Sequence, residues 1–557
     1  MLRTTMWLGF LRRGKAYLLA VILMAGSGVG DSQPSAISGK SGGYENLVSL
    51  FRQWRSFQKP KIVEGVPDYR AASMAAQQRE LASYQQRLTA IDPSGWPISQ
   101  QVDYQIVRAE MNGLDFDHRV LKPWANNPAF YVTVFSEESD QPAREGPFAE
   151  GAVELWSYPF PLTPENAEKI AAGIRAIPGL LAQAKTNLTG DGRDLWVFGT
   201  QSLRQQSVEL RDLAAKLDGG TAGLKADVDR ARQATDDFAA WLDSRVPSKR
   251  GRSGVGIENY NWYLKRVQLV PDTWQEEVAL MERELARSQA LLAMEELRNA
   301  KLSPQTPIAS AQEYAERMNA GVTQYMAFLR EHEILSIRDW MDAALRARIG
   351  TFASGPLEFF SEVDYRDPEI MRTHGYHWFD KGWMAHDPHP SAIRRGPLLY
   401  NIFNTRTEGH ATGWEELMMQ AGMFDARPRS RELVYILVAE RAARALGELR
   451  MQSNEMTLEE ASAFACAHTP RGWLSMNGKL VRSEQHLYLQ QPGYGTSYLI
   501  GKIEIEKILD ERRRQLGEKF TMKQFMDEFN TAGLIPASLL RWELTGRKSE
   551  ELEGMLH

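Results

Sequence analysis

The sequence predicts a mainly α-helical protein with few short strands, and three observations lead to this prediction. Apolar residues recur every three or four positions, as on one face of a helix, and Ile170, Ile174 and Ile177 form one such series. Signals that start a helix are frequent, such as Thr163 followed directly by proline. Alternating patterns typical of strands are rare, and residues 129–135 form the best candidate.

Further helices can be placed from the same signals. Trp274, Val278 and Met281 share one helical face, which indicates a second long helix. Thr457 and Thr521 are expected to cap helices, because a glutamate or glutamine follows each of them three residues later.

Composition places the chain among folded globular proteins. Of its 557 residues, 43% are hydrophobic and 25% are charged. The polar, basic stretch 244–256 is expected to be a loop, so we predict helical regions at 40–245 and 255–557, the second carrying the site. The net charge of −5 gives no reason to expect nucleic-acid binding. Cys466 is the only cysteine, which excludes an internal disulfide and a thiolate metal cluster.

Residues 1–30 have the pattern of a secretory signal peptide. Four basic side chains precede the apolar run 17–25, and small residues with a plausible cleavage point after Gly30 follow it. The run is too short to span a bilayer, so we expect cleavage and no stable membrane insertion, with an uncleaved anchor as the alternative. No cysteine follows the run to carry a lipid. The protein is expected to be periplasmic or secreted, and its oligomeric state stays open.

Half of the ten histidines lie within one short stretch of the C-terminal region. They are His374, His377, His386, His389 and His410, and several carboxylates are interspersed with them. Imidazole and carboxylate groups are the usual ligands of zinc, iron and manganese, and a catalytic site needs three of them with one position left open. The enrichment predicts a metal or acid/base site, with solvated surface histidines as the alternative.

Four blocks of sequence resemble, in their order and spacing, the large bacterial family catalogued as domain of unknown function 885. They are residues 256–264 (GIENYNWYL), 407–411 (TEGHA), 492–501 (PGYGTSYLIG) and 530–536 (NTAGLIP). The resemblance covers nearly the whole chain that would follow signal cleavage. It implies an all-helical architecture similar to that of zinc metallopeptidases.

The resemblance also implies a metal site, with departures that bear on its chemistry. The implied ligands of one divalent metal, zinc first, are His374, Asp380 and Glu408. The glutamate that activates water in the family is Gly375 in this chain. A later aspartate and histidine of the family are replaced by Glu448 and Gln452. These replacements argue against ordinary peptide hydrolysis.

The remaining predictions assign roles to side chains near these ligands. His377 or His410 is expected to act as the acid or base, and Tyr498 to stabilise an oxyanion. The predicted substrate contacts are Trp378, Trp414, Arg406 and Tyr494. Aromatic faces stack on rings and arginine binds carboxylates, although buried tryptophans and solvated arginines are common without a ligand.

Two functions remain open at the level of sequence. The first is an exported enzyme that performs metal-assisted hydrolysis, or acid/base chemistry of the lyase type, on a small organic or peptide-like substrate. The second is a metal-free binding protein, or pseudoenzyme, on the same scaffold. Elemental analysis would separate them, because only the first requires a bound metal.

Overall fold

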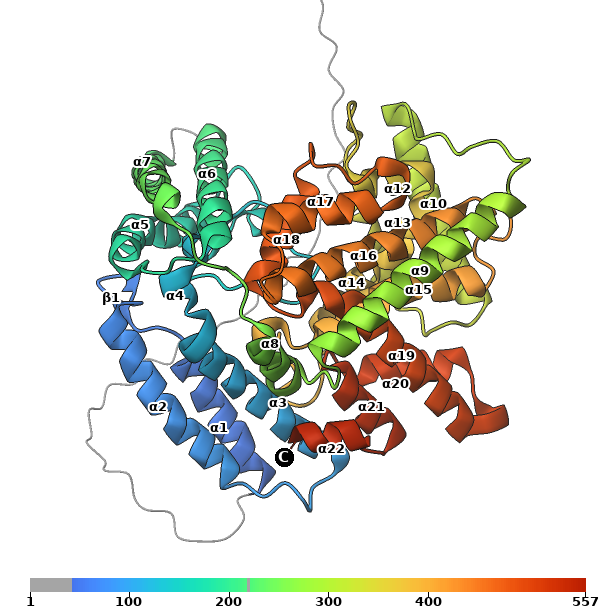
Figure 1. Cartoon of the computed structure of the whole chain (residues 1–557), viewed down its shortest axis with the longest axis horizontal. Helices are drawn as coiled ribbons and strands as arrows, with labels where there is room; N and C mark the ends of the chain where they lie inside the picture. Colours follow the sequence, from blue (N-terminus) through green and yellow to red (C-terminus); the bar gives the residue numbers. More distant parts are fainter. Residues whose placement is uncertain (1–42, 218–220, 557) are drawn as a thin grey trace, which may run out of the picture. The chain divides into compact units, whose positions relative to one another are not determined.

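The computed structural model describes residues 43–217 and 221–556, and they fold mainly into α-helices (Figure 1), which confirms the predicted fold class. The predicted signal peptide, 1–30, lies outside the described residues. Within the described part of the chain, no helix is both long and apolar enough to cross a membrane. Residues from Gly42 onward form one compact unit.

The N-terminal part alternates helices with two very small sheets. Its helices are α1 (Tyr44–Phe57), α2 (Ala71–Thr89), α3 (Ile98–Phe116), α4 (Pro123–Asn126), α5 (Pro164–Asn187), α6 (Arg193–Lys216) and α7 (Ala222–Arg245). Strands β1 (Ile62–Val63) and β2 (Val66–Pro67) pair antiparallel. Strands β3 (Val134–Phe135) and β4 (Val153–Glu154) pair in parallel, Val134 opposite Val153.

The C-terminal part is a succession of helices joined by short turns and by longer irregular segments, such as residues 299–310, 347–358 and 387–398. They are α8 (Ile257–Tyr263), α9 (Trp274–Arg298), α10 (Ala311–Glu331), α11 (Met341–Arg346), α12 (Phe359–Arg366), α13 (Pro368–His374), α14 (Tyr376–His386), α15 (Asn404–Gln420), α16 (Ser430–Gln452), α17 (Leu458–His468), α18 (Leu480–Gln490), α19 (Tyr494–Leu516), α20 (Met522–Thr531), α21 (Ala537–Thr545) and α22 (Glu550–Leu556).

The predicted helix starts are confirmed by their hydrogen bonds. The hydroxyl of Thr163 accepts from the backbone of Asn166 at the start of α5. Thr457 forms a full capping box with the glutamate three residues later, and Thr521 caps α20. The predicted strand at 129–135 is mostly wrong, because Asn127 caps a 3₁₀ turn at Pro128–Tyr131 and leaves only Val134–Phe135 extended.

Two large hydrophobic cores hold most of the buried apolar residues of the described chain, and two small clusters lie beside them. The larger one combines α1 and α3 with the helices of the C-terminal part, so residues near Leu47 and Met555 belong to the same core. The smaller one is formed mainly by α5, α6 and α7. The predicted loop at 244–256 holds only a 3₁₀ turn between α7 and α8. The larger core therefore contains residues from both sides of this loop.

Helices α15 and α19 pack unusually closely, and two glycines explain it. A Cβ added to Gly409 would lie 2.3 Å from the Cα of Gly501, and one added to Gly501 would lie 2.1 Å from the carbonyl oxygen of Thr405. No other residue fits at either position. This contact brings Glu408 on α15 next to the first turn of α19, where Tyr494 lies.

Candidate functional site

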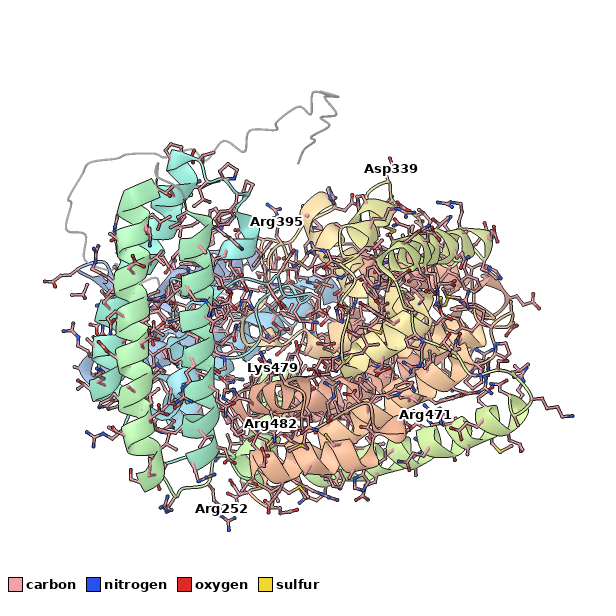
Figure 2. All side chains as sticks on the ribbon, turned by 90° about the horizontal axis from the view of Figure 1, so that it is seen from above. Arg252, Asp339, Arg395, Arg471, Lys479 and Arg482 are labelled. Atoms are coloured by element: carbon pink, nitrogen blue, oxygen red, sulfur yellow. The ribbon has the colours of Figure 1, made fainter. Side chains whose placement is uncertain are left out.

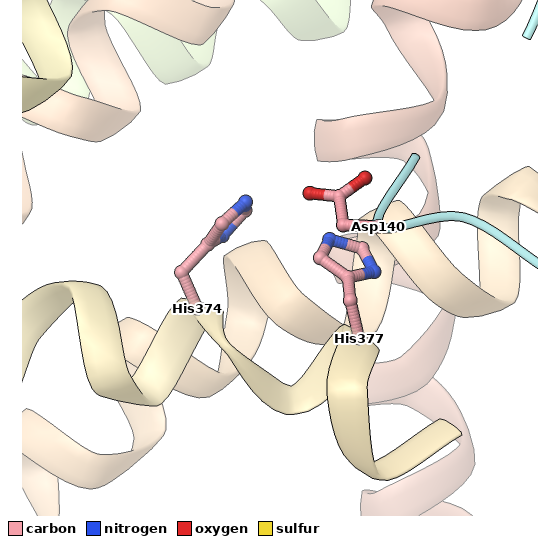
Figure 3. Close-up of side chains that lie close together, drawn as sticks. All are labelled: Asp140, His374 and His377. Carbon is pink, nitrogen blue, oxygen red and sulfur yellow. The ribbon is translucent and has the colours of Figure 1, made fainter. Parts of the chain in front are cut away.

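Two histidines and an aspartate converge in the region that the sequence singled out (Figure 3). One ligand atom each from Asp140, His374 and His377 lies within 4.8 Å of the other two. His374 ends α13 and His377 lies in the first turn of α14, with Gly375 between the helices. Asp140 comes from residues 136–152, the irregular segment that joins β3 to β4, hereafter the 136–152 segment. It supplies a carboxylate from a distant part of the sequence.

The Nδ1 atom of His374 is held in place by two buried charged side chains. Its Nδ1 lies 2.9 Å from Oε1 of Glu415 and 3.1 Å from Nη2 of Arg441. Arg441 in turn donates to both oxygens of Glu415 at 2.8 Å. Burial would raise the pKa of Glu415, but Arg441 and His374 keep it below its usual value. A carboxylate behind an imidazole is the usual support of a metal-binding histidine.

His377 forms an ion pair with Glu408, whose carboxylate lies 3.3 Å from its Nε2. Both side chains are buried. Burial alone would lower the pKa of His377, but the negative charges of Asp140 and Glu408 raise it to about 9. Burial alone would raise the pKa of Glu408, but His377 lowers it to about 2. The imidazole is therefore protonated and the carboxylate ionised at neutral pH when no metal is bound.

The side chain of Gln141 is inserted between these groups. Its Nε2 donates to Oε1 of Glu408 at 2.9 Å and lies 3.3 Å from Nδ1 of His377. Its Oε1 accepts from the hydroxyl of Thr407 at 2.7 Å. Only 1% of Gln141 is exposed. The 136–152 segment thus covers the site as well as contributing Asp140 to it.

Two tyrosines of α19 extend the site. Tyr494 donates to Oε1 of Glu408 at 2.6 Å, and its ring meets that of Tyr498 edge-on at 5.9 Å. The guanidinium groups of Arg441 and Arg444 lie 5.8 and 5.4 Å from the centre of the Tyr498 ring. Burial raises the pKa of both tyrosines, so both are neutral donors at physiological pH. Tyr498 stays partly exposed, whereas Tyr494 is buried.

Sequence reasoning missed Glu145, which also lies in the 136–152 segment. Its Oε1 is 3.5 Å from the hydroxyl of Tyr494. Burial, together with the charges of Asp140 and Glu408, raises the pKa of Glu145 to about 7. No periodicity or motif marks this residue, since only long-range packing brings it to the histidines.

The predicted ligand set of His374, Asp380 and Glu408 is not the group that the structure brings together. Asp380 is bound by both terminal nitrogens of Arg406 at 2.9 and 3.0 Å. That guanidinium also lies 3.9 Å from the centre of the Phe529 ring. Asp380 and Arg406 therefore neutralise each other inside the core instead of facing a metal and a substrate.

His410 and Trp414 point into the core, away from the group of histidines. The His410 ring packs against Tyr376, Trp414 and Phe529, and neither ring nitrogen has a hydrogen-bond partner. Burial lowers the pKa of His410 far below its usual value, so it is neutral. Trp414 is fully buried and donates to Tyr325 at 2.7 Å. Neither matches its predicted role.

The helical period explains this placement. Residues advance about 100° each around a helix, so His410 lies roughly 200° from Glu408. Glu415, seven residues after Glu408, returns to the same face, and it does contact His374. If the residues of α15 had been assigned to helix faces, Glu415 and not His410 would therefore have been predicted to lie on the same face as Glu408.

Trp378 lies outside the group, under the 136–152 segment. Arg348 and Lys381 lie over its ring at 3.8 and 4.9 Å. Both of these cations pair with Glu138, and Nζ of Lys381 also donates to the carbonyl of Ser139. Trp378 therefore supports the two cations that hold the segment down.

A groove of about 980 Å³ runs along the other side of the segment. It lies between α6 and the start of α18, where Lys479 and Arg482 line it (Figure 2). Glu137 and Glu145 of the 136–152 segment face the same groove. Open space thus lies behind the segment that covers the histidines.

No curated protein matches the chain. The fold is similar to that of a candidate lipoprotein of unknown function from Shewanella oneidensis, with a TM-score of 0.64 and 15% identity over 89% of this chain and 97% of that one. A candidate lipoprotein from Colwellia psychrerythraea gives 0.63 and 15% over 92% and 99%. The model of the family described as bacterial protein of unknown function (DUF885) matches residues 59–377 and 375–544. Because these matches span most of the sequence, the chain belongs to the DUF885 family.

Proposed function

We propose that the protein is an exported, metal-dependent enzyme of the hydrolase type that acts on a small organic or peptide-like substrate. The observation that carries this proposal is the group of Asp140, His374 and His377. Two imidazoles and a carboxylate form a ligand set that suits zinc, and Glu408 and Glu145 add negative charge beside them. A divalent cation held there would act as a Lewis acid on a substrate carbonyl.

The chain's own side chains supply the proton transfers. Glu145, with a pKa of about 7, is suited to take a proton from water near neutral pH, which would replace the role lost at Gly375. Tyr498 is neutral and partly exposed, so its hydroxyl can donate to a developing oxyanion. The same carboxylate could remove a proton from carbon in an elimination, which keeps lyase chemistry within the proposal.

A second candidate function is a metal-free binding protein. One expectation and one observation favour it: the resemblance implies that Gly375 replaces the family's water-activating glutamate, and Gln141 lies between His377 and Glu408. The two candidates differ in whether metal binds.

Zinc binding tests the first proposal directly. Protein dialysed against micromolar zinc and then against buffer is expected to retain one equivalent by elemental analysis. His374→Ala should lose it, while His332→Ala, at the exposed end of α10, should retain it. Wild-type protein without zinc would overturn the metal enzyme in favour of the binding protein.

Turnover is tested with a library of peptides and acylated amino acids. Glu145→Gln is expected to lower kcat by about 100-fold or more, the usual contribution of a general base, without releasing zinc. An unchanged kcat would remove Glu145 from the mechanism.

Export is proposed from the secretory pattern at 1–30 and from the structural neighbours, which are named as candidate lipoproteins. Cys466, the only cysteine, lies on α17, so this chain offers no cysteine near residue 30 for a lipid. We expect intact-mass measurement of periplasmic protein to show a chain without residues 1–30. A full-length mass in the membrane fraction would contradict this.

A further inference from the structure

The carboxamide of Gln141 is bound at both ends as a ligand amide would be. The nitrogen end of the amide donates to a carboxylate oxygen of Glu408 at 2.9 Å. The hydroxyl of Thr407 donates to the oxygen end. Glu408 and Thr407 both lie on α15, outside the segment that carries Gln141, and the amide nitrogen also donates to Oδ1 of Asp140 in its own segment at 3.3 Å. The shorter contacts of the amide, at both of its ends, are thus supplied by a separate part of the chain.

Another buried glutamine shows the difference. Gln206, also 1% exposed, accepts from the backbone N–H groups of Thr133 and Val134. Those partners belong to the backbone beside β3 and would be left unsatisfied without it, which is an ordinary structural role. The partners of Gln141 are side chains of the candidate site itself.

The 136–152 segment is built so that it can leave this position. It has no helix or strand of its own, and the groove between α6 and α18 lies behind it. Besides the contact of Gln141 with His377, the segment is held to α14 by Lys381, which pairs with Glu138 and donates to the carbonyl of Ser139, and Arg348 also pairs with Glu138. Few backbone hydrogen bonds would have to break for the segment to move.

We propose that Thr407 and Glu408 form a binding subsite for an amide group, and that the side chain of Gln141 occupies it as an intramolecular competitor. A ligand amide, either a peptide bond or a primary carboxamide, binds when the 136–152 segment moves toward the groove. This inference goes beyond the proposed function: it concerns binding of an amide ligand and not turnover, because movement of the segment also withdraws Asp140 and Glu145. Binding of the amide itself does not require a metal.

The test measures the affinity of full-length, metal-free protein for N-acetylglycinamide by calorimetry. Gln141→Ala removes the competitor, and we expect it to bind the probe at least ten times more tightly than wild type. Gln206→Ala is the matched control, since it shortens an equally buried glutamine beside the same strand, and its affinity should equal that of wild type. N-acetylglycine keeps the peptide-type amide but lacks the primary carboxamide, so its affinity distinguishes the two sources, and acetate, which has no amide, should bind none of the proteins.

A second variant keeps the proposal testable if Gln141→Ala does not fold. Glu138→Gln weakens the outer contacts of the segment without touching the subsite, and it should bind the probe about threefold more tightly. In wild type, saturating probe should speed hydrogen exchange of the 136–152 amides. Equal affinity in wild type and both segment variants, an equal gain in Gln206→Ala, or no binding at all would each overturn the proposal. Zinc retention and turnover are measured separately. If the metal-enzyme proposal fails, the affinity for the amide probe can still be interpreted.

Discussion

The amide nitrogen of Gln141 lies 2.9 Å from a carboxylate oxygen of Glu408, although 267 positions separate the two residues in the sequence. This hydrogen bond joins an irregular segment near the N-terminal helices to the helix that carries the family motif around Glu408. The site is therefore assembled from two distant stretches of chain. Single substitutions test which contacts hold the two stretches together and which residues belong to the site.

Gln141→Glu should disturb the assembly more than its small change in shape suggests. A second carboxylate would replace the donor that Glu408 now accepts from, inside a buried site. We expect the free energy of unfolding at pH 7 to fall by roughly 2 kcal/mol, the cost of an unsatisfied buried polar group. Urea denaturation measures it. A stability equal to that of wild type would mean that the hydrogen bond contributes nothing.

Asp380→Asn tests the assignment of Asp380 to the core. It removes one partner of a buried ion pair and leaves Arg406 uncompensated, so we expect a loss of about 3–5 kcal/mol of stability. Zinc retained per folded molecule should not change. Loss of zinc at unchanged stability would instead return Asp380 to the ligand set.

Gly409→Ala tests the close packing of α15 and α19. Its methyl group would overlap the backbone of Gly501, so we expect a loss of about 3 kcal/mol or more, or no soluble protein. Gly413→Ala on the same helix is the control, since its methyl would lie 3.3 Å from the flexible side chain of Lys502. That variant should be neutral or gain up to about 1 kcal/mol from helix propensity. Equal effects of the two substitutions would contradict the packing argument.

Glu448 predicts a pH dependence of stability. It is buried beside Glu277 and Tyr260 and accepts from the backbone N–H of Thr496 at 3.0 Å. Burial raises the pKa of Glu448 from 4.5 to about 8. The folded state therefore holds a proton that the unfolded chain releases, and stability falls as the pH rises from about 4.5 to 8.

The isosteric variant Glu448→Gln isolates this effect. Its free energy of unfolding should lack the part of the decline that wild type shows between pH 5 and 8, at most about 4 kcal/mol. Urea titrations at pH 5, 6.5 and 8 give the difference between the two proteins. Parallel pH profiles would show that Glu448 keeps its ordinary pKa.

Local features of the sequence predicted the fold well. Helix periodicity and caps such as Thr163 and Thr457 depend on neighbours within a few residues, so they could be identified without the structure. His374 and His377 were singled out because they belong to a local cluster of five histidines, and the structure places them at the junction of two short helices. The family resemblance fixed the region of the site.

The rest of the site depends on contacts that no local pattern encodes. Asp140, Gln141 and Glu145 lie in a segment without periodicity, and only packing against α14, α15 and α19 gives them a role. His410 was selected because it follows Glu408 closely in sequence, yet two residues along a helix lead to the opposite face. Two residues that are close in sequence can thus lie on opposite faces of the same helix.

Asp140 and Gln141 are consecutive residues, and this adjacency couples two binding events. An ion that uses Asp140 as a ligand favours the closed position of the 136–152 segment, whereas an amide that displaces Gln141 favours the open one. Since coupling between two ligands is reciprocal, each should weaken the affinity for the other by the same factor. Binding of an amide would then reduce the number of protein side chains that coordinate a bound metal ion.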